Sequence, residues 1–189
     1  MLLELNDVLL QNEPRTLSMM ARSGEMVCLT GGSAEQRARW LHGIMGFVPV
    51  LSGYICIDGE PLTTDTVAEF RRQMAYAPSR LEREGQIRVF EPPSVQDVFS
   101  LKENRHLPIS NGLLNKEMKL ISEHPDECCQ WLAVAVLRDK PILLVDDPTA
   151  ESVDYLRQQA AKGRVVIVTS SNPLYRSAAD KVIEIEDER

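Results

Sequence analysis

The residues of this sequence that could do chemistry gather in two short segments, each directly after a run of apolar residues. The first segment contains Gly31, Gly32 and Ser33, followed by Arg37 and Ala38 at the start of a predicted helix. Glycines before a helix allow backbone N–H groups to approach an anion, and a guanidinium binds phosphate well. The pattern therefore indicates an anion site. The alternative is an ordinary loop with a solvated arginine on the first helical turn.

The second segment is the pair Asp146 and Asp147, directly after the apolar residues 142–145. Carboxylates at the end of a buried strand can hold Mg²⁺ or act as a general base. They can also simply end the strand and cap the next turn. Both interpretations stay open on these residues alone.

The elements that must position the two segments alternate between strand and helix patterns. Strands are predicted at 2–10, 16–21, 25–30, 53–59, 142–145, 165–169 and 181–186. Helices are predicted at 34–47, 66–74, 127–138, 153–162 and 173–179, with one or two more between 94 and 123, broken around Pro108 and Gly112. Residues 79–97 are predicted as loop. Uniformly apolar strands in the second half of the chain favour a parallel sheet covered on both faces.

Composition limits the class of protein and its partners. The chain has 189 residues, of which 43% are hydrophobic, enough for one domain with a substantial core. The formal net charge is −7 and the largest basic cluster is the pair Arg71 and Arg72, so we expect no nucleic-acid partner.

Cysteine usage and hydropathy indicate a cytoplasmic chain. The four cysteines show no C-x-x-C spacing, which favours free thiols. A zinc site from His124, Cys128 and Cys129 lacks a second pair of ligands. No signal peptide is apparent and no apolar stretch is long enough to cross a bilayer, so we expect no direct insertion into a membrane.

The order of these pieces resembles the nucleotide-binding subunit of an ATP-binding cassette (ABC) transporter. The resemblance covers most of the chain and is carried by residues 24–30 with the following loop and helix, 52–62, 138–149, and 163–169 with 179–186. It implies an α/β fold of the P-loop NTPase type, with a mainly parallel core sheet, an N-terminal antiparallel β subdomain and a shortened helical lobe. The lobe is expected at about 94–128 of a single domain spanning 1–189.

The resemblance also implies roles for the two segments, with ATP and Mg²⁺ as cofactors. Residues 31–39 stand in the place of the family's phosphate loop. The implied phosphate-binding residues are Gly31, Gly32, Ser33, Arg37 and Ala38. Asp146 is the implied Mg²⁺ ligand and Asp147 the implied catalytic residue.

The loop itself departs from the family pattern at most positions, and only Gly31 agrees with it. Ala34 and Gln36 replace glycines, Arg37 replaces the lysine, and Ala38 replaces the hydroxyl residue. These replacements remove the glycines that let backbone N–H groups face the phosphates. They also remove the lysine cation and the hydroxyl that binds the metal.

The other motifs are altered too. No glycine occurs between Gly112 and Gly163, so the signature glycine pair is absent. Asp147 replaces a glutamate, and Ser170 and Ser79 replace a histidine and a glutamine. Asn12 or a neighbour replaces the aromatic residue that stacks on adenine.

Together these changes favour a catalytically degenerate cassette that acts as a structural or regulatory subunit. Its expected partner is a membrane-spanning permease subunit or another ABC cassette, which places it peripherally at the inner face of the membrane. Phe90, Val95, Val98 and Phe99 are candidates for an apolar partner contact. The alternatives are a working ATPase that uses Arg37, Asp146 and Asp147, and a binding protein for another anion at Gly31, Gly32 and Arg37.

Overall fold

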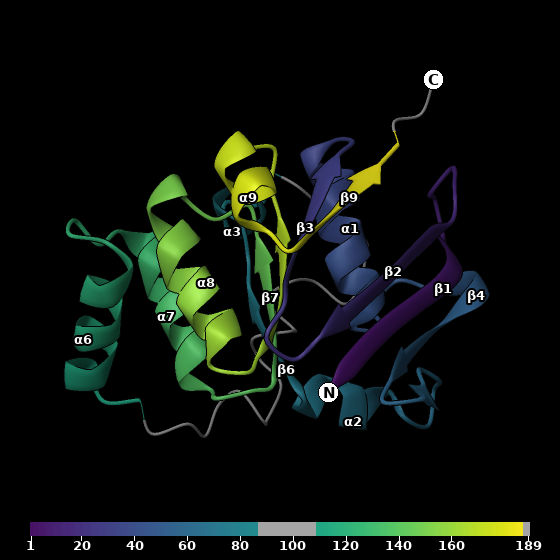
Figure 1. The fold of residues 1–189 in the computed structure, drawn as a ribbon, viewed down its shortest axis with the longest axis horizontal. Helices are drawn as coiled ribbons and strands as arrows, with labels where there is room; N and C mark the ends of the chain where they lie inside the picture. Colours follow the sequence, from purple (N-terminus) through teal and green to yellow (C-terminus); the bar gives the residue numbers. More distant parts are fainter. Residues whose placement is uncertain (87–108, 187–189) are drawn as a thin grey trace.

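A five-stranded parallel sheet forms the centre of the computed structural model, which describes residues 1–86 and 109–186 (Figure 1). The strand order is β6-β7-β8-β3-β9, and every pairing in this sheet is parallel. The strands are β3 (Met26–Gly31), β6 (Met74–Ala77), β7 (Ile142–Asp146), β8 (Val165–Thr169) and β9 (Lys181–Ile185). The carboxyl ends of these strands meet at one edge of the sheet, where ligand sites of such folds usually lie.

A second, antiparallel sheet of four strands has the order β2-β1-β4-β5. Its strands are β1 (Leu2–Leu10), β2 (Leu17–Arg22), β4 (Val50–Ile57) and β5 (Glu60–Pro61). Burial alternates along β2, as expected for a sheet with one face on the core. Met20 therefore points outward and is 41% exposed, whereas Met19 faces the core.

Helices and the second sheet cover the two faces of the core sheet. The helices are α1 (Ala34–Ile44), α2 (Val67–Arg72), α3 (Arg80–Arg83), α6 (Asn111–Ile121), α7 (Glu127–Leu137), α8 (Val153–Ala161) and α9 (Pro173–Ala178), with a 3-10 turn at Ala150–Ser152. One hydrophobic cluster joins α1 and the antiparallel sheet to the core strands, and a second joins α7 and α8 to their other face. Figure 1 shows α6, α7 and α8 on one side and α1 with the antiparallel sheet on the other.

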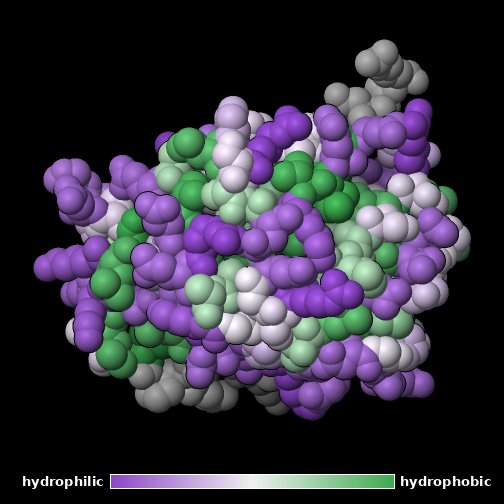
Figure 2. All heavy atoms as spheres, in the orientation of Figure 1, coloured by the Kyte–Doolittle hydropathy of each residue, from purple (hydrophilic) through white to green (hydrophobic). Residues whose placement is uncertain are grey.

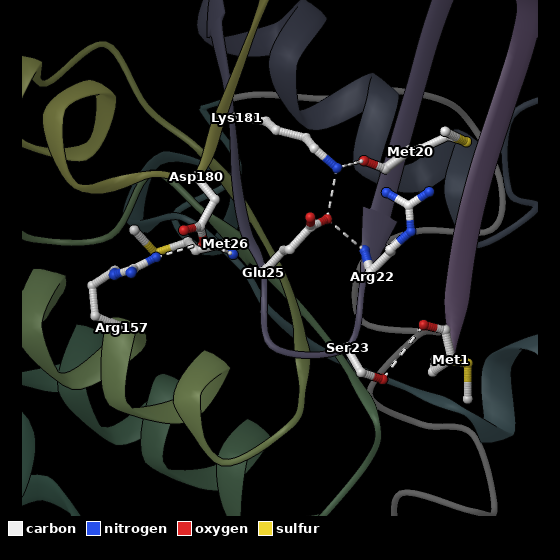
Figure 3. Close-up of polar contacts among 9 residues, drawn as sticks. All are labelled: Met1, Met20, Arg22, Ser23, Glu25, Met26, Arg157, Asp180 and Lys181. Carbon is white, nitrogen blue, oxygen red and sulfur yellow. Dashed lines mark hydrogen bonds and ion pairs between the residues drawn. The ribbon is translucent and has the colours of Figure 1, made fainter.

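Charged side chains fasten the turn between β2 and β3 to the start of β9 (Figure 3). The Glu25 carboxylate accepts from Arg22 N at 2.8 Å and from Lys181 Nζ at 2.7 Å. Lys181 also donates to the carbonyl oxygen of Met20 at 2.9 Å. The hydrogen bond from Lys181 holds the pKa of Glu25 below its usual value, so the carboxylate stays charged. These contacts join the two sheets where they meet.

The surface in the orientation of Figure 1 is mostly hydrophilic, with hydrophobic groups interspersed among polar ones (Figure 2). Exposed large hydrophobic residues of the described chain come from several elements, including Leu51 on β4, Leu113 on α6 and Leu174 on α9. Scattered residues of this kind are normal on a globular surface.

The structure corrects three local predictions. The segment 66–74 is helical only to Arg72, and Met74–Ala77 is the buried edge strand β6. The predicted loop from 79 contains α3, which Ser79 caps. Gly112 does not break a helix but lies in the first turn of α6.

Several expectations fall outside the described residues. The candidate contact residues Phe90, Val95, Val98 and Phe99 are among these, as is the part of the helical lobe before residue 109.

Candidate functional site

The loop between β3 and α1 uses its own side chains to satisfy its backbone. Ser33 is the N-cap of α1, and its hydroxyl accepts from Gln36 N at 3.1 Å. In return the Gln36 side-chain oxygen accepts from Ser33 N at 2.9 Å. This capping box uses two backbone donors at the helix start. Gln36, which stands in place of a glycine by resemblance, thus stabilises the loop in its present shape.

Gly31 and Gly32 both have positive φ, +77° and +54°. A β-carbon on Gly31 would lie 2.4 Å from the carbonyl oxygen of Ile185 on β9, closer than any real contact. The glycine at 31 is therefore required by the backbone of this chain itself, through its conformation and the close approach of β9.

Arg37 folds back onto the loop rather than into solvent. Its Nη1 donates to the carbonyl oxygens of Gly31 at 3.1 Å and Gly32 at 2.9 Å. The residue is only 6% exposed. The interpretation of Arg37 as a solvated side chain is therefore wrong. Its place beneath the loop follows from the position one helical turn after Ser33, which turns the long side chain back toward the helix start.

Ala38 is fully buried and belongs to the hydrophobic cluster around α1. Its methyl group contributes packing and has no polar atom to offer a phosphate or a metal. Of the five predicted loop residues, Gly31, Gly32, Ser33 and Arg37 are brought together, and Ala38 faces the core.

Arg39 ties the turn between β1 and β2 to α1, an arrangement that the sequence analysis missed. It donates to the Glu13 carboxylate at 2.7 Å, to the carbonyl oxygen of Asn12 at 3.2 Å and to the Glu35 carboxylate at 2.9 Å. The Glu13 side chain is only 1% exposed. Arg39, Glu13 and Glu35 thus form a polar clamp, to which Asn12, an exposed residue expected near the adenine-stacking position, adds its backbone carbonyl oxygen.

A small cavity of about 60 Å³ lies next to this clamp, between the β1–β2 turn and the end of β9. Its lining includes Glu13, Leu17, Trp40 and Ile185. The volume is room for about two water molecules.

Asp146 and Asp147 end β7 in very different surroundings. Asp146 is 3% exposed and accepts from Thr169 Oγ1 at 2.5 Å. Burial raises the pKa of Asp146 to about 6, against the lowering effect of its hydrogen bonds from Thr169 and Ser79. Asp147 has φ +44° and an exposed side chain.

The backbone of Asp147 is held by Thr169, whose carbonyl and hydroxyl oxygens accept from Asp147 N at 3.0 and 3.1 Å. Partial desolvation raises the pKa of the Asp147 carboxyl, and the charge of Arg37 lowers it in part. The charge of Arg37 thus acts on Asp147, although the two residues are 110 positions apart in the sequence.

A buried polar cluster next to Asp146 was also missed by sequence reasoning. His42 Nε2 on α1 lies 2.9 Å from Glu82 Oε1 on α3, and both side chains are fully buried. Tyr76 on β6 donates its hydroxyl to the other Glu82 oxygen. Glu82 sits in a charged stretch that predicts an exposed loop, so only the tertiary structure places it inside.

Three negative results concern the described residues 1–86 and 109–186. No group of three or more His, Cys, Asp or Glu side chains there is arranged to hold a metal, so the structure gives no zinc site at His124, Cys128 and Cys129. All four cysteines are free. No helix within these ranges has both the length and the apolar character to cross a membrane.

Comparisons with known proteins agree with the fold. No family model matches the sequence. The thiamine import ATP-binding protein ThiQ of Shigella boydii serotype 4 is 28% identical over 167 residues, which cover 84% of this chain and 72% of that protein. The ATP-dependent lipid A-core flippase of Cupriavidus metallidurans is 22% identical and matches 92% of this chain, but only 33% of its own length.

Solved structures match nearly the whole chain at low sequence identity. An ATP-binding subunit of an ABC transporter has a TM-score of 0.68 and 18% identity, covering 98% of this chain and 86% of that one. A dimeric ATP-binding cassette bound to ADP and Pi has a TM-score of 0.66 and 17% identity, covering 99% and 97%. The protein therefore has the ATP-binding cassette fold and is a homologue of ABC transporter ATP-binding subunits.

Proposed function

We propose that this chain is a nucleotide-independent member of the cassette class, a structural or regulatory subunit of a transport system. Its partner is a membrane-spanning permease subunit or another ABC cassette, and it works at the cytoplasmic face of the membrane. The whole chain, 1–189, acts as one cassette domain. The support comes from the geometry of the loop and of Asp146.

The observation that carries the proposal is the contact of Arg37 with the loop. A phosphate cradle directs backbone N–H groups at the anion. Here the carbonyl oxygens of Gly31 and Gly32 accept from Arg37, and Ser33 N is already used by Gln36. The phosphates of ATP fit this arrangement poorly, because they would meet carbonyl oxygens and a guanidinium already engaged with them.

Asp146 supports the same conclusion for Mg²⁺. A ligand of Mg²⁺ must be ionised and reachable from water, since the ion keeps several of its own waters. Asp146 is 3% exposed, and burial raises its pKa to about 6. Its low exposure weakens it as a metal ligand, because the waters of the ion would have little access to the carboxylate.

Isothermal titration of the chain with ATP, with and without Mg²⁺, tests the proposal. We expect no saturable heat at ATP concentrations up to about 1 mM, corresponding to less than about 4 kcal/mol of binding free energy. Tight binding that requires Mg²⁺ would overturn the proposal.

The second candidate is a working ATPase with unusual residues, with Asp147 as the general base. It is favoured by the exposed Asp147 carboxylate, on which the charge of Arg37 acts. Phosphate release by the wild type, Asp147→Asn and the exposed control Asp154→Asn separates the two. Turnover that is lost in Asp147→Asn and kept in Asp154→Asn would establish the ATPase. Our proposal expects only background in all three.

A further inference from the structure

The segment 79–86, here called the α3 strap, contacts the core through the carboxylate of Glu82 and through Ser79. Glu82 is the central residue of this contact, with one oxygen hydrogen-bonded and the other close to a histidine ring nitrogen. One oxygen lies 2.9 Å from His42 Nε2 on α1, and the other accepts from the Tyr76 hydroxyl on β6. The strap is thus held to the first helix and to the edge strand at once.

Burying the Glu82 carboxylate would destabilise the fold if His42 and Tyr76 were not beside it. The side chains of Glu82 and His42 are both fully buried. A buried charge that loses its partner is strongly destabilising, because no water replaces the lost contact. Burial, followed by the Glu82 charge, holds the pKa of Tyr76 well above its usual value, so the phenol keeps its proton and donates it. Glu82 therefore keeps this buried position only while residues 79–86 lie against α1 and β6.

Asp146 lies beneath the seated strap. The Ser79 side chain hydrogen-bonds to the Asp146 carboxyl, and the Glu82 charge acts on it as well. Thr169 on β8, Tyr76 on β6 and the adjacent Asp147 also interact with Asp146. The strap therefore forms part of the surroundings of Asp146 at the carboxyl ends of β6 and β7.

The strap begins at a helix cap and has a glycine near its other end. Ser79 begins it as a helix cap, with its hydroxyl accepting from Glu82 N at 3.2 Å. Gly85, near its other end, has φ +70° and open space where a β-carbon would be. The four-residue helix between them has little stability of its own, since short helices depend on tertiary contacts.

We propose that the α3 strap is a lid over Asp146 and that the Glu82–His42 pair, backed by Tyr76, holds this lid shut. Opening the lid gives solvent and solutes access to Asp146. The lid goes beyond the proposed function and does not rest on it, because access to Asp146 can be measured whether or not the chain binds ATP.

Carboxyl labelling with a water-soluble carbodiimide and glycine ethyl ester measures this access, with peptide mass spectrometry as the readout. We compare the wild type, Glu82→Gln and Glu84→Gln. Glu84 is on the same strap but pairs at the surface with Arg80 at 2.7 Å, so it is the matched control. We expect the labelling rate of Asp146 to rise about tenfold or more in Glu82→Gln and to stay at the wild-type rate in Glu84→Gln. His42→Gln, which breaks the pair from α1, is expected to give the same increase as Glu82→Gln.

Glu13 serves as an internal control, because its carboxylate is equally buried but far from the strap in sequence and held by Arg39. Its labelling should not change in any variant. If Asp146 labelling is unchanged in Glu82→Gln, the pair does not hold the lid and the proposal is overturned. A parallel rise at Glu13 would also overturn it, because the pair would then hold the whole fold rather than one strap.

Discussion

The guanidinium of Arg39 donates to the buried carboxylate of Glu13 across 2.7 Å, and so joins α1 to the turn between β1 and β2. Both side chains are largely withdrawn from water, at 11% and 1% exposed. A buried pair of this kind contributes little when intact but costs much when one partner is removed. The stability of the fold is therefore sensitive to the loss of either partner of the Arg39–Glu13 pair.

Glu13→Ala is expected to lower the free energy of unfolding by about 3 kcal/mol, because it leaves Arg39 buried with fewer partners. Glu186→Ala is the control, since Glu186 pairs with Arg15 on the same hairpin but at the surface. Its expected cost is below about 1 kcal/mol. Urea unfolding of the three proteins measures both values, and equal losses in the two variants would contradict the account.

The stability of the protein should depend on the ionisation of Asp146. Burial raises its pKa to about 6 in the folded chain, from 3.8 in the reference state. Between these values the folded state binds more protons than the unfolded state, so this group makes stability fall as pH rises from about 4 to 6. Well above pH 6 the carboxyl is fully ionised, and its ionisation lowers the free energy of unfolding by at most roughly 3 kcal/mol.

Asp146→Asn removes this ionisation and tests the sign directly. Urea unfolding at pH 4, 5, 6 and 7, about the range of the titration, measures the free energy of unfolding of both proteins. The value for the variant should rise relative to that of the wild type as pH rises. A wild type that gains stability relative to the variant over the same range would show that the carboxylate is stabilised rather than destabilised in the fold.

Gly31→Ala is expected to destabilise the protein by about 2 kcal/mol or more, because both the positive φ and the 2.4 Å approach of the Ile185 carbonyl oxygen oppose a β-carbon. Gly163→Ala provides the comparison, since Gly163 also has positive φ but open space around it. Its loss should be limited to about 1 kcal/mol of conformational cost. Thermal unfolding distinguishes the two, and a smaller loss at Gly31 than at Gly163 would show that β9 does not press on the loop.

Central strand 165–169 was predictable because its apolar run is short, continuous and bounded by turns, and it has the predicted bounds. Strand 2–10 of the antiparallel sheet also has the predicted bounds, which its partly alternating pattern indicated. Strand β6 was missed because its residues, Met-Ala-Tyr-Ala, have no β-branched side chain and continue a helical pattern. It is a strand because it pairs with β7, which is a tertiary contact.

The candidate site was predictable in place but not in detail. The sequence predicts a parallel sheet with functional residues after β3 and β7, and in the structure the charge of Arg37 acts on Asp147. The fold-back of Arg37 onto two carbonyl oxygens depends on the backbone shape of the loop, which side-chain patterns do not encode. The pairing of His42 with Glu82 joins residues 40 positions apart, and the charged surroundings of Glu82 indicate the surface instead.

A crystal structure of the chain grown with Mg²⁺ and a non-hydrolysable ATP analogue tests the central claim most directly. The account predicts that Arg37 Nη1 remains on the carbonyl oxygens of Gly31 and Gly32 and that no triphosphate enters the loop. A triphosphate seated beside Arg37, with Mg²⁺ on Asp146, would contradict it.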